Sequence, residues 1–287
     1  MPTCYRHPDR ETGLSCSECG RPICTECMTM APVGIRCPDH AGGTARRKLI
    51  SPPKVPRSTT RVLAARVTYA LIAVNVLVYL VTAVQGAGLN SPGGSLYDKW
   101  ILYGPYVDRG DWWRLVTAMF LHGFVVHIAF NMYALWAIGR PVELFLGHTR
   151  YLLLYFVSGL AGSAGALLWS PTTPVVGASG AIFGVLGAMM ILEWQVTGRF
   201  AGQALTLILL NLVINFAFNG LGGNISIGGH IGGVVGGVLC ALAFASWGSR
   251  RASRGRLQIQ GVIGLLVIVA ASLAISYWRV RGLWPPS

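Results

Sequence analysis

Seven long apolar segments, separated by shorter polar stretches, dominate the chain after about residue 66. Each is close to the roughly 20 residues that an α-helix needs to cross the hydrocarbon core of a bilayer. The pattern predicts an all-α polytopic membrane domain over residues 67–279. The expected spans are about 67–86, 118–139, 150–169, 178–194, 203–219, 228–247 and 259–278.

The chain before the first apolar segment is polar and rich in cysteine. Residues 1–42 are predicted to form a small metal-binding module, and residues 43–66 a basic linker that contains prolines. The first 40 residues hold no apolar core of the length that a secretory signal requires. The first apolar segment is therefore expected to act as an uncleaved signal anchor.

The composition supports a membrane protein, because 53% of the residues are hydrophobic, only 11% are charged and the mean hydropathy is +0.55. A soluble domain carries about 25% charged residues. The net charge of +13 does not indicate a nucleic-acid partner, since the cations lie between apolar segments and form no basic patch on a soluble domain. The lipid bilayer is the expected surrounding.

The distribution of cations predicts the orientation, because cytoplasmic loops carry an excess of Lys and Arg. The linker cations place the N-terminus and the metal-binding module in the cytoplasm, and the protein is expected in the plasma membrane. The loop 87–114 is then extracellular, and its tryptophans suit the membrane interface. The cations expected inside, besides the linker, are Arg140, Arg150, Arg199, Arg250, Arg251, Arg254 and Arg256.

Four pairs of potential metal ligands, each with two residues between its members, occur in the N-terminal module. They are Cys4 and His7, Cys16 and Cys19, Cys24 and Cys27, and Cys37 and His40. A structural zinc ion takes four such ligands, so eight predict two ions. In a cross-braced arrangement the first pair joins the third and the second joins the fourth. Pairing in sequence order is the alternative, and the spacing leaves both open.

A disulfide framework is the other interpretation of these cysteines, but the cytoplasmic placement argues against it. A module of this length has too small a core to fold without metal. Its ligand spacing resembles a B-box-like zinc finger. Closed four-ligand sites have no open position for a substrate, so we expect a docking or regulatory role with a cytoplasmic protein partner.

Polar side chains inside a membrane are costly, and each is a candidate functional residue. His127, Asn131, Ser179 and His230 are predicted in the outer half of the bilayer, on the three spans that run from outside to inside. Taken singly, Ser179 could be a small residue for helix packing and His230 a buried core histidine. A shared depth for all four favours one site.

The chemistry of these groups fits acyl transfer. A serine hydroxyl needs a base to take its proton, and His230 can serve Ser179 in this way. The backbone N–H of Ser179 at a helix start can stabilise an oxyanion, as can His127 and Asn131, which lie on one helix face. Since the acids Glu143 and Glu193 are expected at the cytoplasmic side, we predict a dyad without a catalytic cofactor.

Glycines at every fourth position of the sixth span predict close packing against a neighbouring helix. Two such rows occur, and their members are Gly228, Gly232 and Gly236, and Gly229, Gly233 and Gly237. Close packing is what a serine and a histidine on different helices need, because their side chains must approach to roughly 3 Å.

These motifs together resemble the rhomboid family of intramembrane serine proteases. The residues that carry the resemblance are Trp113-Arg114, His122-x4-His127-x3-Asn131, Gly177-x-Ser179-Gly180 and Gly-Gly-His230, within about residues 67–247. The resemblance implies a six-helix bundle, here with a C-terminal seventh transmembrane helix. It also implies cleavage of transmembrane proteins near the outer membrane face, at small residues that precede helix-breaking sequence.

The resemblance implies further roles. His127, Asn131 and the Ser179 N–H would form the oxyanion hole, with Gly177 in the same loop. Trp113, Arg114 and Glu143 would stabilise the first loop. Many relatives have Tyr four residues after the serine, where this chain has Phe183, and its ring can stack on the histidine but has no hydroxyl.

Three alternatives remain. A catalytically inactive rhomboid-like protein would bind and escort membrane proteins. A transporter or channel would need an ionisable path, which the inner half of the spans does not offer. A zinc protease would use His122, His127 and His230, but no His-Glu-x-x-His is present.

Overall fold

The computed structural model describes residues 2–30, 34–40, 65–200, 202–220, 225–244 and 259–284. They divide between two compact units, Met1–Val62 and Leu63–Ser287, and each is described by itself. The predicted linker 43–66 lies outside the described residues, apart from its last two, as do the four arginines predicted inside at 250–256.

The N-terminal unit contains two short antiparallel ribbons. Strand β1 (Thr3–Cys4) pairs with β2 (His7–Glu11), and β3 (Thr29–Met30) pairs with β4 (Ile35–Arg36). An isolated two-stranded ribbon is at best marginally stable in water. The buried centre of the unit consists of Ile23 and five cysteines, so the predicted metal ligands themselves form the core.

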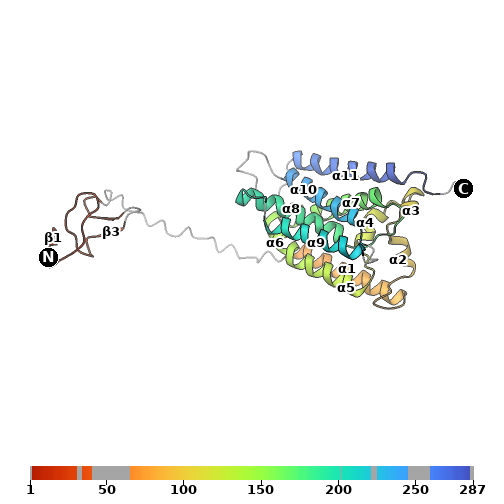
Figure 1. The fold of residues 1–287 in the computed structure, drawn as a ribbon, viewed down its shortest axis with the longest axis horizontal. Coiled ribbons are helices and arrows are strands. Elements are labelled where there is room, and N and C mark those ends of the chain that lie inside the picture. Colours follow the sequence, from red (N-terminus) through yellow and green to blue (C-terminus); the bar gives the residue numbers. More distant parts are fainter. Residues whose placement is uncertain are drawn as a thin grey trace. The chain divides into compact units, whose positions relative to one another are not determined.

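The second unit is helical, and its order along the chain is shown in Figure 1. Helix α11 lies on one side of this unit and α1 with α5 on the other, with α7, α8 and α10 between them (Figure 1). The helices are α1 (Arg66–Gln85), α2 (Gly94–Trp100), α3 (Gly104–Asp108), α4 (Arg114–Thr117), η1 (Ala118–Phe120), α5 (Val125–Ala134), η2 (Leu135–Gly139), α6 (Arg140–Leu146), α7 (His148–Trp169), α8 (Ser179–Thr197), α9 (Gln203–Gly220), α10 (Ile227–Phe244) and α11 (Ile259–Val280).

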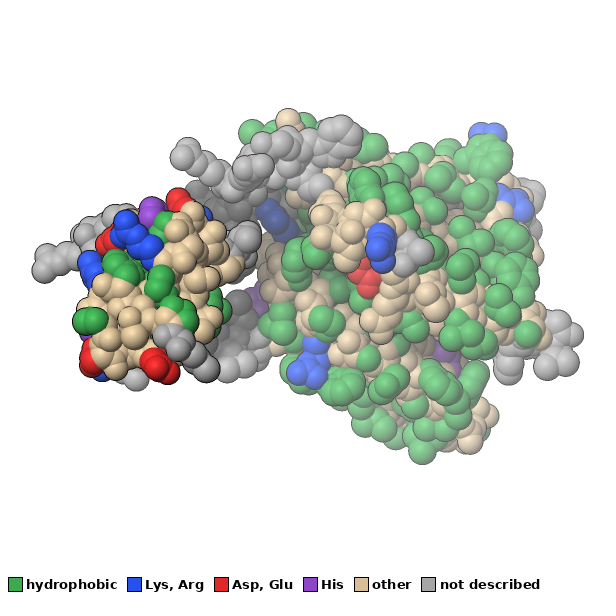
Figure 2. All heavy atoms as spheres, turned by 60° about the vertical axis from the view of Figure 1, so that its left-hand side comes forward, with side chains coloured by type: hydrophobic (Ala, Val, Ile, Leu, Met, Phe, Trp, Pro, Cys, Tyr) green, Lys and Arg blue, Asp and Glu red, His purple; other side chains and the backbone are tan. Residues whose placement is uncertain are grey.

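Among the described residues, five helices are long and apolar enough to cross a membrane, namely α1, α7, α8, α10 and α11. A bent pair, Arg114–Phe120 and Val125–Leu146, provides a sixth candidate, and the apolar part of α9 is shorter. Hydrophobic side chains cover much of the visible face of the helical unit (Figure 2). The chain is a multi-pass membrane protein, and the predicted helical fold class is confirmed.

The second predicted span differs from the structure. Instead of one helix over 118–139, the chain bends by 95° near Gly123, and a new helical run extends from Val125 to Leu146 through the π-helix η2. Phe124 before it is fully extended, with φ −169° and ψ 166°. The sequence is apolar on both sides of this break, so hydropathy does not reveal it. As a consequence His127 lies in the first turn of α5.

Glycines bring α10 very close to two neighbours at once. A Cβ on Gly232 would lie 2.5 Å from the Ala161 carbonyl oxygen of α7, and one on Gly233 only 2.0 Å from the Gly180 oxygen of α8. Real Cβ atoms do not approach backbone so closely, so only glycine allows this packing. The first turns of α8 and α10 are therefore held side by side.

The first loop folds into the short helices α2, α3 and α4 around the buried side chain of Arg114. This guanidinium is 2% exposed and donates hydrogen bonds to the Asp111 carboxylate and to the carbonyl oxygens of Asp98 and Ile101. Burial alone would raise the pKa of Asp111, but hydrogen bonds from Arg109 and Arg114 hold it below its usual value. The loop is thus fixed by ion pairs of Asp111 with Arg109 and Arg114 and by the hydrogen bonds of Arg114 to backbone carbonyl oxygens.

Candidate active site and metal centres

Ser179 and His230 lie in direct contact at the start of two packed helices. Ser179 is the first residue of α8, and His230 lies in the first turn of α10. The serine Oγ is 2.8 Å from the histidine Nε2, a normal hydrogen-bond distance. The histidine is 5% exposed and the serine is half-buried, so the pair lies in a largely enclosed site.

Two further side chains hold the His230 imidazole. The Phe183 ring stacks on it, with the ring centroids 4.1 Å apart and the planes 9° from parallel. The Asn215 amide nitrogen lies 2.7 Å from Nδ1 on the opposite edge of the ring from Ser179. Sequence reasoning missed Asn215. The available signal was the recurrence of asparagine at positions 211, 215 and 219 of an otherwise apolar helix.

The loop before α8 brings His127 toward Ser179. Gly177 has φ +129°, and a Cβ there would lie 2.9 Å from His127 Nε2 and 3.7 Å from the Ser179 Oγ. Any other residue at Gly177 would be strained and would also collide with the imidazole. The Gly123 N–H makes a long contact of 3.5 Å with His127 Nδ1, which leaves Nε2 as the nitrogen directed to the site.

Asn131 is buried one turn further along α5 and donates a hydrogen bond to the His127 carbonyl oxygen at 3.0 Å. The amide nitrogen has a second hydrogen, but no contact found among the described residues joins it to Ser179. His122 is fully buried, and its ring lies edge-on to that of His127 with the centroids 5.0 Å apart. The structure therefore brings together Ser179, His230, Gly177 and His127.

Glu143 does not contact the first loop, contrary to the expected role. Its buried carboxylate accepts hydrogen bonds from the backbone N–H groups of Val67 and Thr68 at 2.9 and 2.8 Å, at the start of α1. It also lies 2.5 Å from His148 Nδ1. A carboxylate at a helix N-terminus satisfies free N–H groups, so Glu143 joins α6 to α1. Trp113 does contact the loop, through a 3.0 Å hydrogen bond to the Lys99 carbonyl oxygen.

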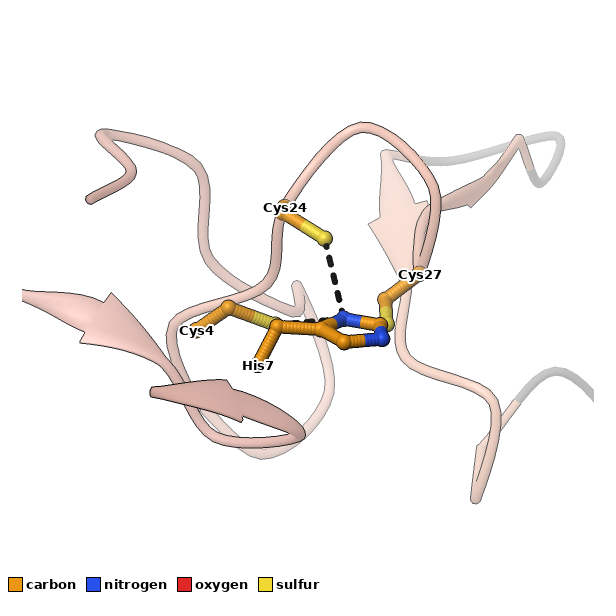
Figure 3. A group of neighbouring side chains, drawn as sticks. All are labelled: Cys4, His7, Cys24 and Cys27. Carbon is orange, nitrogen blue, oxygen red and sulfur yellow. Dashed lines mark hydrogen bonds between the residues drawn. The ribbon is translucent and has the colours of Figure 1, made fainter. Parts of the chain in front are cut away.

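The eight predicted zinc ligands form two groups in the N-terminal unit. In each group the ligand atoms lie within 4.8 Å of one another, and Figure 3 shows the first group converging around the His7 ring. The groups are Cys4, His7, Cys24 and Cys27, and Cys16, Cys19, Cys37 and His40. This is the cross-braced arrangement, and the pairing in sequence order does not occur. The seven cysteines, all of them described, form no disulfide.

The donor geometry fits a tetrahedral metal ion. In the first group the sulfurs of Cys24 and Cys27 lie 3.4 and 3.3 Å from His7 Nδ1, and in the second the Cys19 and Cys37 sulfurs are 3.8 Å apart. Zinc bonded to sulfur and nitrogen at its usual distances would separate such ligands by about 3.6 to 3.8 Å. Burial alone would raise the pKa of Cys4, but hydrogen bonds with the backbone and with His7 lower it to about 6, which favours the thiolate.

The fold and the site define a polytopic helical membrane protein with a serine and a histidine in contact, preceded by a Cys/His module. In a comparison with known protein families, residues 109–247 match the rhomboid domain. The chain is 35% identical over 167 residues to rhomboid protease GluP of Bacillus subtilis, a match that covers 57% of this chain and 32% of that protein.

Other relatives match the same region. RHOMBOID-like protein 5 of Arabidopsis thaliana is 40% identical over 118 residues, which cover 38% of each chain. Rhomboid protease AarA of Providencia stuartii is 33% identical over 147 residues, or 45% of this chain and 51% of that protein. The chain therefore spans about a third to a half of the length of these relatives.

Proposed function

We propose that the protein is an intramembrane serine endopeptidase that cleaves transmembrane proteins near the outer membrane face. The observation that carries this proposal is the 2.8 Å contact between the Ser179 hydroxyl and His230 Nε2. The rhomboid domain supports the same assignment, because the relatives GluP and AarA are named rhomboid proteases. Contact between these side chains favours an enzyme over the escort protein, which needs neither group.

In this mechanism His230 Nε2 takes the Ser179 proton while Oγ attacks the scissile carbonyl carbon. The resulting tetrahedral intermediate collapses when the carbon–nitrogen bond breaks and the imidazolium returns its proton to the leaving amine. Water then attacks the acyl-enzyme, with the same histidine as base, and releases Ser179. No step needs a cofactor, and the candidate metal groups among the described residues do not include His122, His127 and His230.

The oxyanion is proposed to receive hydrogen bonds from the Ser179 backbone N–H and from His127, with Asn131 as a third donor. Ser179 begins α8, so its N–H lies in the first turn, where helix N–H groups have no partner within the helix. The close approach of His127 Nε2 to Gly177 supports a donor on that side. The second hydrogen of the Asn131 amide is available for the same purpose.

The N-terminal module is proposed to bind two structural zinc ions on the cytoplasmic side of the plasma membrane and to dock a cytoplasmic protein. The cross-braced ligand groups support two closed sites, since every ligand in each group is used. Such a module would regulate or localise the protease and take no part in peptide hydrolysis.

A reconstituted cleavage assay tests the main proposal. Purified protein in liposomes is mixed with a single-pass substrate, and the product mass gives the cut site. The parent is expected to cleave, whereas Ser179→Ala and His230→Ala lose at least about 1000-fold in rate, since each removes one member of the dyad. Cleavage by both variants at the parental rate would reject the dyad.

A fluorophosphonate probe separates a protease from an escort protein without any knowledge of the natural substrate. The probe forms a covalent bond only with an activated serine, so the parent is expected to be labelled and the Ser179→Ala variant is not. A folded parent that binds membrane proteins but resists labelling and cleaves nothing would favour the escort protein.

A further inference from the structure

Asn215 contacts the one atom of the His230 ring that decides whether this histidine can act as a base. The amide group lies 2.7 Å from Nδ1, while Ser179 lies 2.8 Å from Nε2. Both asparagine and histidine are more than nine-tenths buried, so water has little access to either side of the contact. With Phe183 stacked on its face, the imidazole is held on two edges and one side.

A neutral imidazole has one proton, and the position of that proton matters here. Nε2 can accept the serine proton only when the ring proton is on Nδ1. The Nδ1–H group then needs an acceptor, because an unpartnered buried donor is costly. The Asn215 side chain supplies one when its amide turns by 180°, which places Oδ1 where Nδ2 lies and leaves the position of the group unchanged.

We propose that Asn215 is a positioning residue that accepts a hydrogen bond from His230 Nδ1–H through Oδ1 and so fixes the base-competent tautomer. This inference rests on the proposed protease function and adds a third member to the predicted dyad. When His230 becomes an imidazolium, the same oxygen accepts from a charged donor, which strengthens the hydrogen bond during the reaction.

No described carboxylate is engaged at His230. Glu143 contacts the start of α1, Glu193 accepts a hydrogen bond from the Ala204 N–H at 3.1 Å, and Asp111 is paired with arginines. His127 is the other titratable side chain near the pair, on the far side of Gly177. An amide suits this setting, because it orients the imidazole without adding a buried charge inside the membrane.

The fold also fixes the height of Asn215 relative to His230. Asn219, one turn further along α9, accepts the Ile225 N–H with its Oδ1 and donates its Nδ2 to the Ile225 carbonyl oxygen, both at 2.7 Å. Ile225 lies just before α10, so this double contact ties the end of α9 to the beginning of the helix that carries His230. Asn211, one turn earlier, donates a hydrogen bond to the Leu207 carbonyl oxygen of its own helix at 2.8 Å.

The test compares Asn215→Ala and Asn215→Asp with the matched variant Asn211→Ala on the same face of α9. Asn215→Ala is expected to lower kcat by about 10- to 100-fold while KM stays within about twofold of the parent. Asn215→Asp keeps an acceptor of the same shape and is expected to retain most of the rate. Its negative charge stabilises the imidazolium, so the acidic limb of the pH–rate profile should move to higher pH. Asn211→Ala should have the kcat, KM and pH–rate profile of the parent.

The tautomer itself can be measured by ¹⁵N NMR of histidine-labelled protein, with His230→Ala to assign the signal. The parent should carry the proton on Nδ1, and Asn215→Ala should move it toward Nε2. A parent protonated on Nε2, or an Asn215→Ala variant that cleaves within twofold of the parent at every pH, would overturn the inference. If the parent does not cleave at all, the proposed function fails, and the tautomer measurement still decides the role of Asn215.

Discussion

The two units of this protein bring residues that are distant in sequence together by different means. In the N-terminal unit, side chains as distant in sequence as Cys4 and Cys27 converge in a module with almost no apolar core. In the helical unit, Ser179 and His230 are 51 positions apart and meet because glycines let α8 and α10 pack backbone against backbone. We expect the first convergence to need a bound metal ion, whereas the second is built into the helix surfaces.

The difference follows from the solvent of each unit. A small module in water cannot bury enough apolar surface to order its chain, so metal–ligand bonds are expected to supply the missing free energy. Helices in lipid gain little from burying apolar side chains, so close packing of small residues holds them together. Disruption of one site should therefore leave the other intact. Each change described below is expected to affect only one of the two sites.

Removal of metal should have the largest effect, and only on the N-terminal unit. Structural zinc contributes about 10–16 kcal/mol in zinc-finger peptides, more than a module of this size can replace. The parent is expected to hold two zinc ions per chain by elemental analysis. A strong chelator should make residues 1–42 sensitive to protease while fluorophosphonate labelling of Ser179 persists. Cys24→Ser and Cys37→Ser should each lower the zinc content, whereas Cys240→Ser, outside both groups, should leave it at two.

Removal of residues 1–42 tests whether cleavage depends on the N-terminal module. Basal cleavage should stay within about twofold of the parent, because the proposed catalytic residues all lie beyond residue 65. The measurement is the rate in liposomes at equal amounts of folded protein. Complete loss of cleavage in the truncated protein would show that the module does more than regulate.

Gly233→Val should separate the serine from the histidine. The new Cβ would lie 2.0 Å from the Gly180 carbonyl oxygen, so α10 must move away from α8. A displacement of about 1 Å at a reacting group costs on the order of 100-fold in rate. We expect at least that loss in probe labelling, with the zinc content unchanged. Val235→Phe adds a larger side chain to the exposed face of the same helix and should label as the parent does.

Features set by local sequence patterns could be predicted from the sequence, whereas features set by contacts between distant segments could not. The polytopic helical class and the ligand set of the metal groups follow from local patterns, namely apolar length and Cys/His spacing. The choice between the two ligand pairings did not follow, because it depends on how the chain folds back on itself. Asn215 was missed for a related reason, since its partner lies on another helix.

The bend at Gly123 and the partner of Glu143 were harder still to predict from the sequence. The segment 118–139 is mostly apolar on both sides of the break, and the 95° bend near Gly123 depends on packing rather than on composition. Glu143 was expected to stabilise the first loop, but the helix that carries it extends to Leu146, and its carboxylate meets the start of α1. Hydropathy gives the number of residues in an apolar run and not the depth of each along the membrane.

Arg114→Ala should destabilise the helical unit without changing the metal groups. It removes the buried partner of Asp111 and leaves the carbonyl oxygens of Asp98 and Ile101 without their donor. The loss of one partner of a buried ion pair costs about 3–5 kcal/mol, which corresponds to a fall in the unfolding temperature of roughly 6–20 °C. Lys99→Ala removes an exposed cation from the same loop and should change the unfolding temperature by less than about 2 °C. Equal shifts for the two variants would contradict a structural role for Arg114.

The smallest effect on activity is expected at Phe183, where many rhomboid proteases carry Tyr. In this chain the ring already stacks on His230 at 4.1 Å, and Asn215 occupies the Nδ1 edge. A hydroxyl on the ring would therefore add little to the orientation of the imidazole, and Phe183→Tyr should change kcat/KM by less than about threefold. Phe183→Leu removes the aromatic face, and since such pairs are worth about 0.5–1.5 kcal/mol it should lower kcat/KM by roughly 2- to 12-fold. A gain of more than tenfold in the Tyr variant would instead mean that the hydroxyl supplies a hydrogen bond that Asn215 does not.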